Sequence, residues 1–321
     1  MNVLIVDMFG CSYPSLGHQI FSAFELLGHN VRSFHYRQHH LQKFSLTNRL
    51  LNKSLIKVAK SWPADLVFVS KGETIIPGTI EKISSLGCKT ANWGPDEPFG
   101  ELQKFNKIEN VSEYDAFFMY DHQYVNRLRE LNPNSYYLPA CADPLGVHRE
   151  LVLLENRSFP SDVCMVGTAY GNRIPLMQKF VGKRLLIAGP GWNKAPNELS
   201  SISLPPVDLR SMVRLFNQSK IVLNPHGASK SFIMPNPRTF EIPASRSFQL
   251  TDAHRDIDSF FRKGKEIIIY KTEEELLELA EYYLSHHDER LKITQASYNR
   301  VIKEHTMVHR IREILQRMNL Q

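Results

Sequence analysis

The stretch PNPRTFEIPASRSFQLTD, residues 235–252, joins a short apolar helix to a strand. Pro237 suits the first turn of a helix, because its fixed φ fits there and its missing N–H leaves no bond unmade. Arg238 follows it, where a cation opposes the helix dipole, so we expect Arg238 to serve an anionic group. Glu241 lies three residues further on, inside the apolar run. Such a carboxylate can hold the hydroxyls of a ribose, or it can cap a helix or pair with a cation. From this stretch alone both interpretations stay open.

The alternation of helix and strand extends along the whole chain. Runs such as NVLIVDM (2–8) and ADLVFVS (64–70) are separated by helical patterns, which is typical of parallel βαβ units. Residues 140–161 interrupt the rhythm and read as loop and linker, and DVCMVG (162–167) restarts it. We therefore predict an α/β protein with two Rossmann-like domains in series and a boundary near residue 155. Three helical stretches close the chain, at residues 272–287, 288–305 and 307–318.

Composition limits the class of protein. The chain has 321 residues, of which 42% are hydrophobic and 22% charged, as expected for a globular protein with two cores. No stretch approaches the roughly 18 apolar residues of a membrane span, and MNVLIVDMFG lacks the basic start and long apolar region of a signal peptide. We expect a cytoplasmic protein. The four cysteines form no C-x-x-C pair and are expected to be reduced thiols; they are Cys11, Cys88, Cys141 and Cys164.

The charge balance favours anionic partners. The net charge is +6 and the isoelectric point is near 9.0, which suits nucleotides, phosphates or an anionic lipid surface. Lysine and arginine are scattered, with no run of five or six, so we expect no nucleic-acid partner. Peripheral proximity to a membrane stays open.

Two loops after predicted strands contain glycine. In RLLIAGPGWNK, Gly189 and Gly191 follow a strand and could present N–H groups to a phosphate, although a plain turn is the alternative. In DVCMVGTAYGNR, Thr168 ends a strand and Arg173 begins a helix, which suits an anion or a capped helix with a surface arginine. The dinucleotide fingerprint G-x-G-x-x-G is absent from both.

The order of these features resembles the CgeB-like glycosyltransferases, a group named for a spore-maturation protein, within the GT-B class. The resemblance is carried by the strand-G-T loop, the strand-G-x-G-W loop, KIVLNPH, RTFEIPA with FQLTD, and the stretch FFRKGKEIIIYKTEEELLELAEYYL. It continues through RVIKEHTMVHRI, where His305-Thr306 is similar to the closing H-T of the family. In the first half, ADLVFVSKG and the W-x-x-D-x-P loop of CKTANWGPDEP agree more loosely.

The resemblance implies an acceptor-side domain at residues 1–155, a nucleotide-sugar domain at 156–305, and a helix at 306–321 that packs back on the first domain. It implies a metal-independent transfer from a nucleoside-diphosphate sugar to a hydroxyl of a glycan, lipid-linked or protein acceptor, with no cofactor. Glu241 would hold the ribose and Arg238 the diphosphate, with help from Arg173 or Lys194. The other donor-site residues it implies are Thr168, Gly189, Gly191, Trp192, Asn224, His226, Thr251 and Asp252.

One position departs from the retaining GT-B pattern, because Ile233 stands where many such enzymes carry a second glutamate. An inverting transfer needs a general base. Asp96 is the first candidate, with Glu97 beside it, and an aspartate hydrogen-bonded within its own turn is the alternative. His18 is the second candidate, and a helix cap or surface position is its alternative.

We expect no catalytic metal. The D-x-D of Asp256 to Asp258 is read as the start of a helix, and the pairs His39-His40 and His286-His287 as surface. Two other functions remain alternatives: a nucleotide-sugar epimerase on the same fold, and a protein that binds a nucleotide sugar without turning it over. The donor base and sugar, the acceptor and the stereochemistry stay open.

Overall fold

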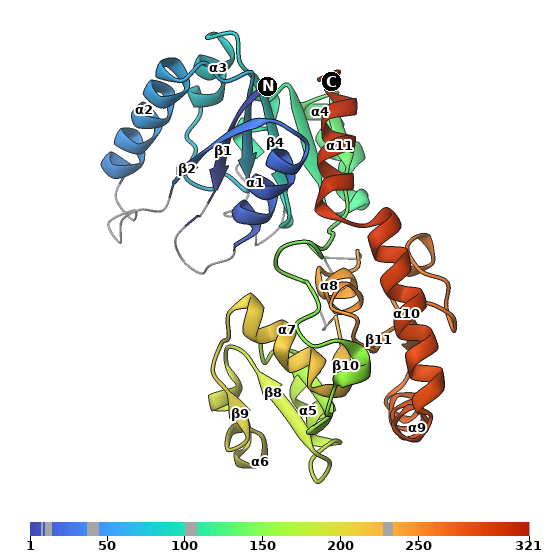
Figure 1. Cartoon of the computed structure of the whole chain (residues 1–321). Helices are drawn as coiled ribbons and strands as arrows, with labels where there is room; N and C mark the ends of the chain where they lie inside the picture. The colour runs from blue at the N-terminus through green and yellow to red at the C-terminus, as the bar shows by residue number, and fades with distance from the viewer. Residues whose placement is uncertain (8, 10–14, 37–44, 100–107, 227–233, 321) are drawn as a thin grey trace. The chain divides into compact units, whose positions relative to one another are not determined.

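The computed structural model describes residues 1–321 except 8, 10–14, 37–44, 100–107, 227–233 and 321. The chain forms two compact units, one of residues 1–139 with 307–321 and the other of residues 140–306 (Figure 1). The C-terminal helix α11, Met307–Arg317, thus belongs to the first unit, where it packs against α1, Leu16–Leu26.

The first unit is a parallel sheet covered by helices. Its six strands lie in the order β2-β1-β3-β4-β5-β6, the order of flavodoxin-like folds. The strands are β1 (Asn2–Asp7), β2 (Asn30–His35), β3 (Leu66–Ser70), β4 (Lys89–Gly94), β5 (Ala116–Met119) and β6 (Ser135–Tyr137). The remaining described helices are α2 (Ser45–Ser61), α3 (Thr79–Ser84) and α4 (Val125–Leu131), with 3-10 turns η2 (Ile108–Glu113) and η3 (His122–Tyr124).

The second unit is also a parallel six-stranded sheet, in the order β12-β11-β10-β7-β8-β9. Numbered within the unit and read from the β9 edge, this order is 3-2-1-4-5-6, that of nucleotide-binding Rossmann folds, and it reverses between β7 and β10. The strands are β7 (Ser161–Val166), β8 (Leu185–Ala188), β9 (Ser203–Leu204), β10 (Ser219–Asn224), β11 (Gln249–Asp252) and β12 (Ile268–Tyr270). The helices are α5 (Arg173–Gln178), α6 (Asn197–Ser200), α7 (Leu209–Asn217), α8 (Arg238–Ala244), α9 (Glu273–Ser285) and α10 (His287–Glu304), with turns η4 (Leu154–Asn156), η5 (Trp192–Lys194) and η6 (Ile257–Ser259).

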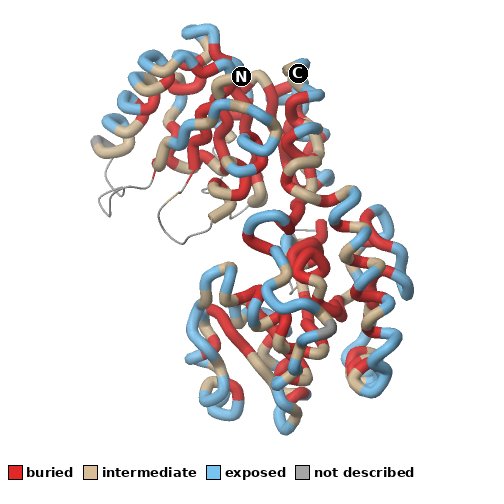
Figure 2. Tube along the Cα trace, viewed as in Figure 1, coloured by how far each residue is buried: buried red, intermediate tan, exposed pale blue. Residues whose placement is uncertain are grey.

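The central strands are buried on both faces, which is why they read as continuous apolar runs. Val3 to Val6 of β1 and Leu66 to Val69 of β3 have no exposed surface. The edge strand β2 is partly exposed along its length. Its sequence, NVRSFH, is accordingly less apolar than that of the central strands. Figure 2 shows the same division in both units, with buried strands enclosed by helices whose outer faces are exposed. Such burial of parallel strands by helices is what the βαβ pattern predicts.

The segment between the units belongs to the second. The predicted boundary lay near residue 155, but residues 140–155 pack on the unit that follows them. Leu151 and Val152 donate main-chain N–H bonds to Asn217 Oδ1, and Arg157 donates to the carbonyl oxygens of residues 245 and 246. Because these bonds link segments distant in sequence, the loop-like composition of residues 140–155 does not reveal them.

Candidate functional site

The candidate site lies at the carboxyl edge of the second sheet, where the strand order reverses. β7 ends there at Val166 and β10 at Asn224. Arg238, the first residue of α8, donates from Nε to the main-chain oxygen of Val166 at 3.4 Å. The helix that carries Glu241 therefore begins beside the end of β7. In open parallel sheets this reversal point is where nucleotides bind.

Glu241 is a buried carboxylate with two partners. Its side chain is 8% exposed, and Oε2 accepts a hydrogen bond from the Arg238 guanidinium. Oε1 lies 3.4 Å from Nε2 of His148, whose side chain has no exposed surface. His148 lies in residues 140–161, which read as loop and linker, and it is not among the site residues predicted from the sequence. The one local signal is the turn from Asp143 to Gly146 that directly precedes this histidine.

The surroundings of Glu241 keep it ionised. Burial alone would raise the pKa of this carboxyl, but Arg238 and His148 beside it outweigh burial and hold the pKa at about 2. An ionised carboxylate accepts hydrogen bonds at about four lone-pair sites. Two of these sites face the chain's own donors, so further sites can accept from the hydroxyls of a ligand.

A second pair of side chains joins the ends of β10 and β11. His226 Nδ1 lies 2.6 Å from Asp252 Oδ1, and the His226 main-chain N–H donates to the same carboxylate at 3.0 and 3.1 Å. His226 Nε2 lies 3.3 Å from the Thr239 hydroxyl of α8. The Thr251 hydroxyl donates to the Asn224 main-chain oxygen at 2.8 Å. Four predicted donor-site residues thus lie together at two adjacent strand ends.

Two further polar side chains lie close to this pair. The rings of His254 and His226 have centroids 4.5 Å apart, and burial, followed by His226, lowers the pKa of His254 to about 4. Burial, followed by the Asp252 charge, raises the pKa of Tyr270. Among the residues that the structure describes, neither His254 Nδ1 nor the Tyr270 hydroxyl has a hydrogen-bond partner, although both atoms are buried. Buried polar groups of this kind are satisfied by a polar ligand or by water.

The loops after β7 and β8 are bonded to each other. Ala169 donates to the Pro190 carbonyl at 2.9 Å, and the Trp192 indole donates to the Gly167 carbonyl at 2.7 Å. Trp192 has no exposed surface and packs in the core. The expected pocket-lining role of Trp192 is therefore replaced by a structural one, because its indole holds the two loops together.

Gly189 and Gly191 serve the same loop contact. A Cβ on Gly189 would lie 2.3 Å from the Gly167 oxygen, and its own N–H donates to Leu204 at 3.2 Å. That N–H is not free for a phosphate, contrary to the expectation for this loop. Gly191 has a φ of +84° and lies next to Ala169. Both glycines are needed for the close approach of two backbones.

Arg173 is committed to the main chain. Its Nε and NH2 donate to the Pro225 carbonyl at 3.0 and 2.7 Å, and NH1 donates to the Thr168 carbonyl at 3.1 Å. The guanidinium also lies 4.4 Å above the Tyr170 ring, and the residue is 7% exposed. Arg173 therefore joins the loop after β7 to the end of β10 and has little capacity left for a diphosphate. Lys194, the other predicted helper, is exposed at the end of η5.

Asp96 lies after β4 in the first unit and pairs with a lysine. Lys71 Nζ is 2.9 Å from Asp96 Oδ2, and both side chains are about one quarter exposed, at 28% and 27%. Lys71 follows β3 in a left-handed conformation with φ of +61°, which is uncommon for a lysine. Glu97, the residue after Asp96, lies beside Tyr124. Burial and the Glu97 carboxylate raise the pKa of Tyr124. Adjacent strand ends thus bring together Lys71 and Asp96.

His18 closes the start of α1. Its Nδ1 accepts the Ser15 main-chain N–H at 3.1 Å and lies 2.9 Å from the Ser15 hydroxyl. Partial burial lowers the pKa of His18. The alternative interpretation of His18 as a helix cap is the arrangement observed. Because Nδ1 accepts the backbone bond, a neutral His18 carries its proton on Nε2.

Three of the residues considered as metal ligands, Asp258, His286 and His287, are exposed. Within the described ranges, no group of three or more His, Cys, Asp or Glu side chains could hold a metal ion. Asp258 pairs with Lys263 at 2.7 Å, and the His286 ring stacks on Tyr282. His39, His40, Cys11 and Ile233 lie outside the described residues. Nor does any described helix have both the length and the apolarity to cross a membrane.

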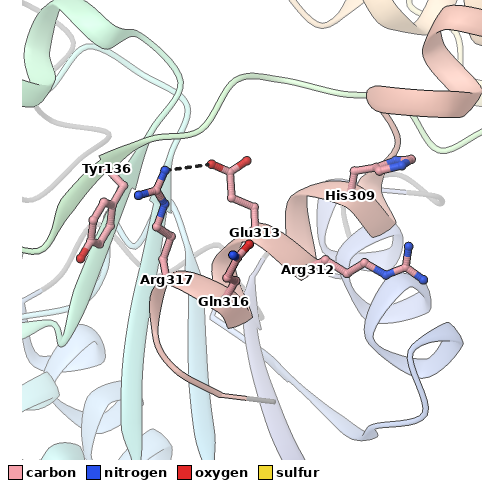
Figure 3. Close-up of a pocket in the computed structure, with 6 residues that line it drawn as sticks. All are labelled: Tyr136, His309, Arg312, Glu313, Gln316 and Arg317. Carbon is pink, nitrogen blue, oxygen red and sulfur yellow. Dashed lines mark ion pairs between the residues drawn. The ribbon is translucent and has the colours of Figure 1, made fainter.

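A pocket of about 630 Å³ lies on the surface of the first unit, and none of the six described residues that line it is a predicted site residue. Figure 3 shows the residues that line it, Tyr136 of β6 and five side chains of α11, with Arg317 next to Tyr136. Arg317 pairs with Glu313 at 3.7 Å, and its guanidinium lies 5.3 Å from the Tyr136 ring. The pocket's cations are thus partly neutralised by its own carboxylate.

Comparisons with a protein family and with solved structures find similarity to glycosyltransferases. Residues 173–316 match the family model described as "Glycosyl transferase-like". The chain is 24% identical over 281 residues to the spore protein CgeB of Bacillus subtilis (strain 168), covering 79% of this chain and 82% of the relative. A solved α-glucosyltransferase in complex with UDP and DNA is similar at a TM-score of 0.70 and 12% identity, over 99% of each chain. Anabaena Alr3699/HepE in complex with UDP-glucose is similar at a TM-score of 0.67 and 9% identity, over 100% of each chain.

These findings confirm the predicted resemblance to CgeB-like glycosyltransferases and the α/β fold of the GT-B class. The matched residues 173–316 include α8 with Glu241 and the His226–Asp252 pair. His148 and Asp96 lie outside the matched range.

Proposed function

Starting from this similarity to glycosyltransferases, we propose that the chain transfers a sugar from a nucleoside-diphosphate sugar to a hydroxyl group of a glycan, lipid-linked or protein acceptor, without a metal ion. UDP-sugars are the first donors to test, because the α-glucosyltransferase carries UDP and Alr3699/HepE carries UDP-glucose in their solved complexes. The acceptor class rests on the fold alone.

One observation carries the proposal: an ionised, buried Glu241 at the reversal point of a Rossmann-type sheet. Its side chain is 8% exposed and its pKa is held at about 2. A carboxylate at this place can accept hydrogen bonds from the two neighbouring hydroxyls of a ribose. The bonds are charge-assisted and therefore about twice as strong as those between neutral groups.

Arg238 is the proposed ligand of the diphosphate. Its side chain is 29% exposed, whereas that of its partner Glu241 is 8% exposed, so the guanidinium has a solvent-facing side that can meet phosphate oxygens. A positive charge beside the leaving diphosphate stabilises the negative charge that develops as the bond to the sugar breaks. Asn224, His226, Thr251 and Asp252 would face the sugar and the phosphates from the adjacent strand ends.

Asp96 is the proposed general base for an inverting transfer. Its carboxylate would take the proton of the acceptor hydroxyl as that oxygen bonds to the anomeric carbon and the bond from this carbon to the diphosphate oxygen breaks. Lys71, whose Nζ lies 2.9 Å from Asp96 Oδ2, would hold this carboxylate in place. His18 is the weaker candidate, because its Nδ1 caps α1.

A thermal-shift screen with UDP, GDP, ADP, CMP and dTDP, each with and without sugar, tests the donor class. A ligand at 100 times its dissociation constant stabilises the folded state by about 2.7 kcal/mol, which raises the melting temperature by a few degrees. We expect UDP to stand out, and no shift with any nucleotide would contradict the proposal. Incubation of the preferred donor without acceptor then separates transfer from epimerisation, since an epimerase converts the sugar of the donor by itself.

A further inference from the structure

His148 is a buried histidine that contacts the central carboxylate of the site from a distant part of the sequence. Its side chain has no exposed surface, and Nε2 lies 3.4 Å from Glu241 Oε1. In the described part of the chain, this Nε2 atom has no hydrogen-bond partner, so the 3.4 Å contact with Glu241 is a close approach of two polar atoms rather than a formed hydrogen bond. A histidine that is fully buried beside a carboxylate needs a reason, because burying a polar ring is unfavourable unless its nitrogens are satisfied.

The loop before His148 fixes the direction of its ring. The main-chain N–H of Asp143 donates to His148 Nδ1 at 2.9 Å, and the His148 N–H donates back to the Asp143 carbonyl at 2.7 Å. The Asp143 carboxylate accepts the main-chain N–H groups of Gly146 and Val147 at 3.0 and 3.3 Å. A Cβ on Gly146 would lie 2.3 Å from this carboxylate, so the loop closes tightly only with glycine there.

These bonds also fix the tautomer. Because Nδ1 accepts the Asp143 N–H, the proton of the neutral ring is on Nε2, the nitrogen that faces Glu241. His148 is thus a hydrogen-bond donor aimed at Oε1, while the Arg238 guanidinium donates to Oε2. One carboxylate oxygen therefore accepts a hydrogen bond from Arg238, and the other faces the His148 Nε2 atom at 3.4 Å.

The loop and helix α8 are joined through a shared cluster of rings. Ala142 donates to the His305 carbonyl at 3.1 Å, and the His305 ring lies 5.3 Å from that of Phe240. Phe240 directly precedes Glu241 and has no exposed surface. The loop that carries His148 and the helix that carries Glu241 therefore both contact His305, the loop through its main-chain oxygen and the helix through its ring.

We propose that His148 is a positioning residue that orients the Glu241 carboxylate toward the ribose hydroxyls of the nucleotide and so makes the site selective for ribonucleotides. The inference rests on the proposed function, since it assumes that Glu241 contacts the ribose. If the donor from His148 is removed, the carboxylate keeps its charge but turns toward Arg238. The bonds to the hydroxyls then weaken, while contacts to the base and the diphosphate remain.

The test compares UDP with 2′,3′-dideoxy-UDP, which lacks both hydroxyls, by calorimetric titration. The measured quantity is the ratio of the two dissociation constants. We expect His148→Leu to reduce the wild-type preference for UDP about tenfold, the effect of one charge-assisted hydrogen bond, with the affinity for dideoxy-UDP little changed. His148→Gln, which retains a side-chain N–H donor, should restore most of the preference. If His148→Leu does not fold, His148→Phe carries the same expectation.

Two further variants separate positioning from packing. The double variant His148→Leu with Glu241→Gln should show no less preference than Glu241→Gln alone, because both changes act through the same carboxylate. Phe180→Leu is the matched control: it removes another fully buried ring of the same unit, from a core cluster that includes neither His148 nor Phe240. It should leave the preference for UDP unchanged.

Equal weakening of UDP and dideoxy-UDP binding by His148→Leu would overturn the inference and make His148 a packing residue. Such a result would leave the proposed function standing, since wild-type protein would still prefer UDP. Wild-type protein that binds neither nucleotide, or binds both equally, would instead contradict the proposed function together with this inference.

Discussion

Arg238 ion-pairs with Glu241 within the first turn of α8, and the pair is asymmetric: the arginine side chain is 29% exposed and the glutamate 8%. The anion is thus buried and fixed, whereas the cation retains a side open to a ligand. This asymmetry explains why a cation stands at the start of a helix, where it opposes the dipole.

The first prediction concerns the diphosphate. Arg238→Met should weaken UDP binding by roughly 10- to 150-fold, the loss of a hydrogen-bonded charge contact, and should affect uridine much less. Calorimetric titration with both ligands measures the difference. Arg246→Met is the matched control, because Arg246 is also 29% exposed and paired with a glutamate, at 3.2 Å from Glu150. Equal losses for UDP and uridine would remove Arg238 from the diphosphate site.

The second prediction concerns acid stability. His254 has a pKa of about 4 in the folded chain, lowered by burial and then by His226, against an ordinary value of 6.5. The unfolded chain therefore binds more protons than the folded chain between pH 6.5 and 4, so acidification through this window favours unfolding. The Asp252 charge acts in the opposite direction and raises the pKa of His254, but burial and His226 outweigh it. His254→Gln should lose less melting temperature than wild type between pH 7 and 4.5, and parallel curves for the two proteins would refute the assignment.

The third prediction concerns the contact of the two loops. Gly189→Ala should destabilise the chain by roughly 3 kcal/mol or more, because φ is +138° and the new Cβ would lie 2.3 Å from the Gly167 oxygen. Gly182→Ala is the control: its φ is +94°, but nothing lies within 4 Å of the new Cβ. That change should cost only about 1–2 kcal/mol. Urea unfolding of both variants measures the difference, and similar midpoints would show that the loop contact is not tight.

The fourth prediction concerns the general base. Asp96→Asn should lower the turnover number by about 10²- to 10⁴-fold while leaving the dissociation constant of UDP unchanged, since the proposed role involves the acceptor proton only. Single-turnover kinetics with the preferred donor and acceptor measure it. His18→Gln should change turnover only a few fold, and the opposite ranking would move the base to His18.

The sequence predicts local features well and distant contacts poorly. The helix of α8 and the strand β11 follow from a first-turn proline, an apolar run and a strand pattern within residues 235–252. Trp192 and Arg173 follow strands, as ligand-binding residues do, but the structure turns Trp192 into the core and Arg173 onto two carbonyls. No periodicity distinguishes these outcomes, because each residue is the first of a short helical segment that follows a loop.

The contact of His148 with Glu241 is one that the sequence does not predict. Its loop has the composition of a linker, and four strands of the sheet separate it in sequence from its partner Glu241. Only the three-dimensional fold brings the two together. The pairing of Lys71 with Asp96 is easier to predict from the sequence, since β3 and β4 are consecutive parallel strands whose carboxyl ends must lie side by side.

The most direct test of the account is calorimetric titration of UDP into wild-type protein and Glu241→Gln at pH 7. Glutamine retains the size of the buried side chain but removes its charge, so circular dichroism should show both proteins folded. We predict that wild-type protein binds UDP and that the variant loses about 1.5–3 kcal/mol of binding free energy, the value of a hydrogen bond to a charged group. A folded variant with wild-type affinity for UDP would contradict the central claim that Glu241 holds the ribose.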